Sequence, residues 1–287
     1  MEIRPGIHQV PGLKWSNAYL LVEDEGLTLI DGGIPGDGSK ILRYISQLGH
    51  TPQDLTRIVL THSHPDHSGP MKELSRISGA TIAVHEKDTR YQPKTGGRRL
   101  HYPGQPPAFD WNVPFLRRIP AHETIEDGQI LPVMGGLQAL HTPGHTPGSV
   151  CLHLPEHGVL FTGDILLSNG RRFRRPVYFP GTDLKDYRAS VERLAGLTFE
   201  TACGGHGDPI LEEGTARLHE MWTAIRGSAP AGPSSNAGPG YYSPTNPRTL
   251  PDPTRFQGTR RDFPPWFFLP NREASQDTHP IMVIGIR

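Results

Sequence analysis

The feature that most constrains this chain is a cluster of metal-ligand side chains on one short segment. The segment has the pattern H-x-H-x-D-H, formed by His62, His64, Asp66 and His67. Chance would produce such a pattern in only about two chains per thousand of this length and histidine content. The apolar segment 57–60 before it predicts a strand, and the segment 70–77 after it has a helical pattern. The cluster is therefore expected on a turn that joins a strand to a helix.

A turn of this kind presents side chains to two neighbouring points. Alternating positions direct the imidazoles of His62 and His64 to one point, while Asp66 and His67 face a second. This arrangement suits two adjacent metal ions better than one. Imidazole and carboxylate ligands together suit zinc, iron or manganese. The competing interpretation, solvated histidines on a surface loop, would require the pattern to have arisen by chance.

Length, charge and cysteine content limit the class of protein. The 287 residues allow one large domain or two small ones, and the 29 basic and 29 acidic residues leave no net field for nucleic acid or an anionic membrane. No apolar run approaches the roughly 18 residues of a membrane span, and the N-terminal residues lack a targeting pattern. Cys151 and Cys203 predict packed thiols. We expect a cytoplasmic protein with a small-molecule substrate and no nucleic-acid or membrane partner.

Hydrophobic periodicity and turn residues predict that strands and helices alternate up to about residue 227. Strands are expected at 18–22, 27–30, 57–60, 80–84, 137–140, 149–154, 159–161 and 201–203. Helices are expected at 70–77, 186–194 and 213–225, and at 39–48 with Ser39 as the N-cap. The order of these elements indicates an α/β chain.

Two segments have a different composition. The segment 91–120 is rich in Pro, Gly and Arg without a clear period, so an insertion or lid-like loop is expected there. Eleven of the thirty prolines fall within 228–287, together with several aromatic residues. Because disordered segments are usually poor in aromatics, we expect an extended arm that packs on its own domain or on a neighbouring subunit of a homo-oligomer. The predicted organisation is a catalytic domain, 1–227, followed by this arm, 228–287.

Three later motifs complete a resemblance to the metallo-β-lactamase superfamily. TPGHTPGS at 142–149 resembles the loop of that family's third histidine, FTGD at 161–164 its bridging-aspartate loop, and GGHG at 204–207 its last-histidine loop. They occur in the family's order, each after a predicted strand, and the similarity covers about residues 1–225. The resemblance implies an αββα sandwich, in which two mixed β-sheets are flanked by helices and the site lies along one edge of the sheets.

The resemblance also implies a complete set of ligands for two divalent metal ions, zinc in the first place and iron or manganese as alternatives. One ion would be held by His62, His64 and His145, the other by Asp66, His67 and His206, with Asp164 between them. Asp66 is also assigned a catalytic role. Two neighbouring cations need a bridging carboxylate and a bridging hydroxide, and that hydroxide would be the nucleophile of a hydrolase.

Differences between this sequence and individual branches of the superfamily limit the reactions that can be expected. Cysteine-ligand β-lactamases have Cys at the place of Asp164, and the diiron flavoproteins usually have Glu at the place of His64. The pattern is most similar to glyoxalase II-like thioesterases and lactonases, although the Pro-rich arm does not resemble the helical glutathione-binding domain of glyoxalase II. We therefore expect hydrolysis of a thioester, a lactone or another small ester. A mononuclear-iron persulfide dioxygenase-like oxidoreductase, a phosphoesterase and a binding module on the same fold remain alternatives.

Other residues have a functional and a structural interpretation. Asp31, in the family-like segment Asp31-Gly32-Gly33, is expected to support the metal-binding loop rather than to be a ligand. An arginine-rich loop could grip an anionic substrate or be simply solvated. Tyr178 and Tyr187 could stabilise an oxyanion or be packing residues. The arginines of this loop are Arg171, Arg172, Arg174 and Arg175. The histidines outside the motifs, expected to be ordinary, are His8, His50, His85, His101, His122, His141, His153, His157, His219 and His279.

Overall fold

The computed structural model describes residues 1–89, 121–176 and 182–227, and the structural statements below refer to these residues. The predicted insertion at 91–120, Tyr178 and the arm at 228–287 lie outside the described residues. The division into a catalytic domain and an arm therefore stays a prediction. None of the described helices combines the length and the apolar character needed to cross a membrane.

The first sheet has seven strands that are neighbours in chain order. Strands β1 to β4 pair antiparallel, and β4 to β7 pair parallel. Because β4, β5 and β6 run in one direction, the loops that follow them meet at one edge of the sheet. The strands are β1 (Glu2–Arg4), β2 (Ile7–Gln9), β3 (Tyr19–Glu23), β4 (Gly26–Ile30), β5 (Leu55–Val59), β6 (Thr81–His85) and β7 (Glu123–Ile125).

The second sheet has five strands in the order β14-β11-β10-β9-β8. Strands β8 to β11 pair antiparallel, and β11 pairs parallel with β14. It follows that β9, β11 and β14 run in the same direction and deliver their following loops to one edge. The strands are β8 (Ile130–Leu131), β9 (Leu137–His141), β10 (Val150–Leu154), β11 (Val159–Gly163) and β14 (Thr201–Gly204), with β12 (Leu167–Ser168) and β13 (Phe173–Arg174) as a separate hairpin.

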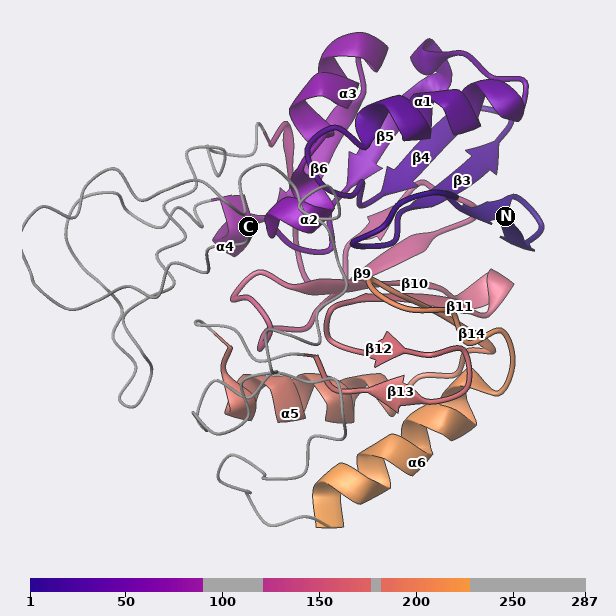
Figure 1. Ribbon diagram of the computed structural model, residues 1–287. Helices are drawn as coiled ribbons and strands as arrows, with labels where there is room; N and C mark the ends of the chain where they lie inside the picture. Colours follow the sequence, from indigo (N-terminus) through magenta and orange to yellow (C-terminus); the bar gives the residue numbers. More distant parts are fainter. Residues whose placement is uncertain (90–120, 177–181, 228–287) are drawn as a thin grey trace, which may run out of the picture. The chain divides into compact units, whose positions relative to one another are not determined.

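The two sheets pack face to face with helices on their outer faces (Figure 1). Between the sheets, Tyr19 of β3 meets Phe161 of β11 with ring centroids 5.3 Å apart. Outside the first sheet, Ile41 and Leu74 pack from α1 and α3, and outside the second sheet α5 contributes Val191. The predicted αββα sandwich is confirmed. The helices are α1 (Gly38–Gln47), η1 (Pro52–Asp54), α2 (Pro65–Ser68), α3 (Met71–Ser78), α4 (Glu86–Thr89), η2 (Pro155–His157), α5 (Leu184–Leu194) and α6 (Gly214–Gly227).

Some helix and strand boundaries differ from the prediction. They differ where an element is very short or where tertiary contacts determine its ends. The prediction of Ser39 as N-cap was wrong, since α1 begins after Asp37. The Asp37 carboxylate accepts hydrogen bonds from the Ile34 backbone N–H (3.1 Å) and the Lys40 ammonium (2.6 Å), which anchors the start of the helix. Strands β1, β2, β7 and β8 were not predicted, because two or three residues are too few to show a period.

Both cysteines are buried free thiols, as predicted. Burial raises the pKa of Cys151 to about 12 and also raises the pKa of Cys203. Neither thiol is therefore ionised at neutral pH, and neither has the character of a nucleophile.

Candidate metal centre

The first ligand segment follows β5 directly. A proline opens α2, where its fixed φ is favourable, and His64 is the N-cap whose carbonyl accepts hydrogen bonds from the N–H groups of His67 (3.0 Å) and Ser68 (2.9 Å). Asp66 and His67 thus lie on a short helix of their own, whereas the sequence predicted a turn that joins the strand to a helix. Successive residues of a helix point about 100° apart, so this turn separates the directions of the two side chains.

The predicted first triad, His62, His64 and His145, converges on one point. His145 comes from the loop between β9 and β10, in the other sheet. The Nδ1 atom of His64 lies 3.1 Å from His62 Nε2 and 2.9 Å from His145 Nε2. Residues 81 positions apart in the chain therefore present ring nitrogens to the same small volume.

The predicted second triad, Asp66, His67 and His206, also comes together. His206 follows β14, and its Nε2 atom lies 3.4 Å from both His67 Nε2 and Asp66 Oδ2. The distance from His67 Nε2 to Asp66 Oδ2 is 3.7 Å. This triad contains a carboxylate, which the first triad lacks.

Asp164 follows β11 and lies between the triads. Its Oδ2 atom is 3.4 Å from His145 Nε2 and 3.2 Å from His206 Nε2, and its Oδ1 atom is 3.5 Å from His67 Nε2. Burial opposes ionisation of Asp164, but the histidines around it, His206 and His67 foremost, hold the pKa of this carboxyl well below its usual range. The carboxylate is therefore charged and within reach of both triads.

Asp31, at the end of β4, orients His67 from behind. Its Oδ2 atom accepts hydrogen bonds from His67 Nδ1 (2.9 Å) and Thr61 Oγ1 (2.7 Å), and its Oδ1 atom accepts one from the Thr61 N–H (2.9 Å). Because Nδ1 donates to Asp31, Nε2 of His67 is the atom turned toward the centre. The geometry agrees with the predicted supporting role of Asp31.

The segment before β3 supports the second triad, a role that sequence reasoning missed. The Nδ1–H of His206 donates to the backbone carbonyl of Trp15 (2.6 Å), and the Ser16 hydroxyl donates to the carbonyl of Asp66. The Asn17 side chain donates to the carbonyls of Gly204 (3.0 Å) and Gly207 (2.7 Å) on either side of His206. Most of these partners are backbone atoms, which no sequence motif records.

The histidines of the first triad are held in the neutral form. Burial lowers the pKa of His62 well below its usual value, and the neighbouring histidines lower it further. Burial and His64 lower the pKa of His145 to about 3, and burial also lowers the pKa of His64. Neutral imidazole is the form that binds a metal ion, so this triad is ready to bind at neutral pH.

The histidines of the second triad have the opposite tendency. Burial opposes protonation of His67, but the attraction of Asp164, Asp66 and Asp31 raises its pKa to about 10. Burial also opposes protonation of His206, yet Asp164 raises its pKa. In the metal-free protein, protons take the place that a cation would have among these carboxylates.

The chemistry of the cluster fits metal ions. The Oδ1 atom of Asp164 is buried and has no hydrogen-bond partner among the described residues. A buried carboxylate oxygen without a hydrogen bond is costly, and a cation would satisfy it. The same cation would attract the ring nitrogens that converge within about 3 Å of one another. These groups therefore fit divalent metal ions.

The other predicted candidates belong to none of the clustered ligand groups. Arg171, Arg172, Arg174 and Arg175 are exposed, and Tyr187 is buried in the apolar cluster under α5. Several of the remaining histidines bond to backbone carbonyls, such as His153 to Thr198 (3.3 Å) and His219 to Ala195 (2.7 Å). Within the described part of the chain, these histidines belong to none of the clustered groups.

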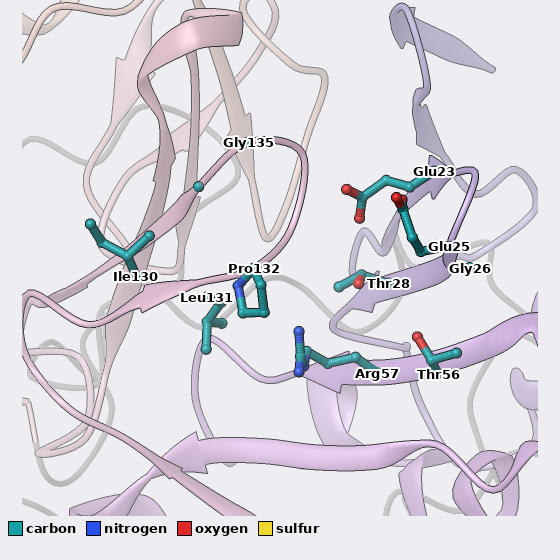
Figure 2. Close-up of a pocket in the computed structure, with 11 residues that line it drawn as sticks. Glu23, Glu25, Gly26, Thr28, Thr56, Arg57, Ile130, Leu131, Pro132 and Gly135 are labelled. Atoms are coloured by element: carbon teal, nitrogen blue, oxygen red, sulfur yellow. The ribbon is translucent and has the colours of Figure 1, made fainter.

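Figure 2 shows a hollow of about 660 Å³ at another place in the molecule. Glu23, Arg57 and Ile130 are among its lining residues, which come mainly from β3, β4, β5 and β8. Thr56 and Arg57 lie toward the start of β5, whereas the metal-ligand segment follows the end of that strand. The hollow contains none of the seven clustered residues, and we assign it no role in the reaction.

Comparison with known proteins decides the family. Residues 13–206 match the sequence model of the metallo-beta-lactamase superfamily, and this range includes all seven residues of the cluster. The chain belongs to the metallo-beta-lactamase superfamily. The prediction of a hydrolase with the metallo-beta-lactamase fold is confirmed at this level.

Individual members of the superfamily show how far the similarity extends. The probable metallo-hydrolase YflN of Bacillus subtilis is 26% identical over 234 residues, covering 73% of this chain and 86% of YflN. The thioesterase pkgB of Emericella nidulans is 30% identical over 211 residues, covering 72% of this chain but only 49% of pkgB. Among solved structures, metallo-beta-lactamase family protein TTHA1429 from Thermus thermophilus has a TM-score of 0.63 at 26% identity, over 78% of this chain and 81% of that chain. The chain thus spans about half the length of the fungal thioesterase.

Proposed function

We propose that this chain is a dinuclear metal-dependent hydrolase that cleaves a small ester-type substrate, a thioester or a lactone. The observation that carries the proposal is the position of Asp164. Its oxygens lie 3.4 Å from His145 Nε2 and 3.5 Å from His67 Nε2, so one carboxylate reaches a ligand of each triad. Two cations roughly 3.5 to 4 Å apart need such a shared anion between them.

In this proposal, His62, His64 and His145 hold the first ion, Asp66, His67 and His206 hold the second, and Asp164 is shared. Zinc is the proposed metal, because imidazole-rich sites with one or two carboxylates suit it, and iron or manganese would accept the same ligands. Bound there, divalent ions would supply Lewis acidity toward a carbonyl oxygen and lower the pKa of water to roughly 7.

The side chains of the protein divide the remaining tasks. His62 and His145 are almost fully buried, which closes the inner side of the site to water. Asp66 and His206 each have 29% of the side chain exposed, so the substrate approaches from the second triad. We assign the catalytic role to Asp66, whose partly exposed carboxylate would accept a proton from the attacking water and pass it to solvent.

The second triad also favours this reaction over the alternatives. A mononuclear-iron oxidoreductase of the persulfide dioxygenase type would leave Asp66 and His206 without a metal, although the structure holds both in place through backbone contacts. The similarity to a protein named thioesterase supports the thioester as the first substrate class to test. A phosphodiester belongs in the same test as a competing class.

The test combines metal analysis with a substrate panel. The purified protein, loaded with zinc, iron or manganese and desalted, is expected to retain close to two ions per chain by elemental mass spectrometry. The zinc protein is expected to hydrolyse a thioester or a lactone faster than a phosphodiester. The His206→Ala variant, matched in purification, should lose this activity. A stoichiometry near one, or turnover of phosphodiesters alone, would contradict the proposal.

A further inference from the structure

Asp88 lies outside every motif of the ligand set, yet its side chain contacts both loops that carry the first triad. It belongs to α4, directly after β6, and only 1% of its surface is exposed. Its Oδ2 atom accepts hydrogen bonds from the Ser63 N–H (2.7 Å) and the Thr146 hydroxyl (3.0 Å), and its Oδ1 atom accepts one from the Gly148 N–H (2.7 Å). A buried carboxylate with three donors is a strong and specific anchor.

The partners of Asp88 have a definite relation to the ligands. Ser63 stands between His62 and His64 on the loop that follows β5 of the first sheet. Thr146 and Gly148 follow His145 on the loop between β9 and β10 of the second sheet. One carboxylate therefore fixes the separation of the two loops whose imidazoles must converge.

The His145 loop packs closely against Asp88. A Cβ atom on Gly148 would come within 2.6 Å of the Asp88 backbone nitrogen and would also collide with its carboxylate. The Thr146 hydroxyl lies 2.7 Å from the Ser149 hydroxyl, which also accepts a hydrogen bond from the Thr146 N–H (3.0 Å). The loop is thus braced internally and docked on Asp88 as a unit.

A second contact joins the end of β6, which leads to Asp88, to the end of β9, which leads to the His145 loop. The rings of His85, at the end of β6, and His141, at the end of β9, stack with centroids 4.1 Å apart and an interplanar angle of 8°. His141 Nε2 donates to the carbonyl of Pro147 (2.9 Å), within the same loop. The end of β6 and the His145 loop are therefore held together at two adjacent places, of which Asp88 is the one that also reaches the His62 loop.

We propose that Asp88 is a positioning residue that sets the geometry of the His62, His64 and His145 triad by joining its two loops. This inference rests on the proposed function, since it assigns those three residues to one metal ion. Asp88 belongs to none of the candidate ligand groups, and its carboxylate is engaged by three donors from the two loops. Its counterpart is Asp31, which orients His67 of the second triad.

The test measures metal affinity at one triad at a time. The His206→Ala background keeps the first triad and the His145→Ala background keeps the second. In the first background, Asp88→Asn is expected to weaken zinc binding about 10- to 100-fold in chelator competition, the usual effect of losing an outer-shell partner. In the second background the same substitution should change zinc affinity less than about twofold, because the second triad has its own supports.

Two additions keep this test decisive. If Asp88→Asn does not fold, Thr146→Val takes its place. This variant removes one of the three hydrogen bonds to Asp88 at nearly constant volume, and we expect a smaller loss of zinc affinity, confined to the first triad. Asp31→Asn is the matched control and should give the reverse pattern. Equal losses in both backgrounds, or none in the first, would overturn the positioning role. A wild-type stoichiometry near one would contradict the dinuclear proposal but leave the result for the His206→Ala background readable.

Discussion

The two proposed metal-binding triads differ in what surrounds their candidate ligands. The first consists of three imidazoles, with His62 and His145 almost fully buried, and its loops come from both sheets. The second pairs two imidazoles with a carboxylate, and the side chains of Asp66 and His206 are 29% exposed. Burial keeps the first triad neutral, while carboxylates keep the second protonated in the metal-free protein.

This difference suggests a division of labour. A neutral triad with two of its three imidazoles buried would bind a cation without releasing protons, which suits a permanently held ion. A partly exposed triad with a carboxylate gives substrate and water a path to the second ion. Asp164 lies close to ligands of both triads, to His145 on one side and to His67 and His206 on the other. Variants that act on one triad or on both can therefore test this difference.

The largest effect is expected from Asp164→Asn, because it acts on both triads at once. The amide keeps the shape but removes the negative charge between the two cations, so their repulsion increases. Affinity for at least one ion should fall by more than the roughly 100-fold typical of losing an outer-shell partner, and hydrolysis should be lost with it. Elemental analysis and circular dichroism on the same sample separate metal loss from unfolding. A variant with two ions and native turnover would show that Asp164 is not shared.

The next largest effect is expected from His206→Ala, which should empty the second triad and leave the first largely loaded. The remaining ligands of the second ion, Asp66 and His67, are too few to hold it without His206. The first triad has no residue in common with the second, although His62, His67 and Asp164 form a third group that joins the two. Metal stoichiometry should fall from about two to about one per chain, and His145→Ala is the reciprocal control. Equal loss of both ions in the His206→Ala variant would mean that the triads are not separable.

A smaller effect is expected from Asp31→Asn, which alters the partner of His67 without removing a ligand. The neutral amide cannot replace the negatively charged oxygen that accepts hydrogen bonds from both His67 Nδ1 and Thr61 Oγ1. The imidazole ring of His67 therefore loses its fixed orientation. Zinc affinity of the second triad, measured in the His145→Ala background, should fall about 10- to 100-fold. The first triad, measured in the His206→Ala background, should change much less. If the first triad lost more affinity than the second, the assignment of Asp31 to His67 would be wrong.

The most gradual effect is expected from pH. The pKa of His67 is raised to about 10, so between pH 7 and 9 zinc must displace its proton, and affinity of the second triad should rise about tenfold per pH unit for each proton released. The histidines of the first triad have lowered pKa values, so they are already neutral and zinc affinity there should stay constant over this range. Chelator competition on the two single-triad variants measures both slopes. Parallel slopes would remove the proposed electrostatic difference.

The candidate metal ligands could be proposed from the sequence for a physical reason. Metal ions bind only a few side-chain types. Four residues of these types, His62, His64, Asp66 and His67, occur within six positions after β5 and so form a visible pattern. His145, Asp164 and His206 stand alone in the chain, and only the surrounding family-like motifs marked them. The structure brings all seven together. Their role as metal ligands stays a prediction that the variants above can test.

The order of the longer strands and helices could also be predicted, because burial of one face leaves a period in the sequence. Apart from Asp31, the contacts that hold the candidate ligands could not be predicted. Asp88 is 25 residues from Ser63 and 60 from Gly148, and its partners there are backbone N–H groups. The carbonyl of Trp15, which fixes His206, is 191 residues away in the chain. Every residue has a backbone carbonyl, and every residue except proline has a backbone N–H. A contact to a backbone group therefore leaves no pattern in the sequence. Only the packing of the two sheets determines which backbone groups contact the ligand loops.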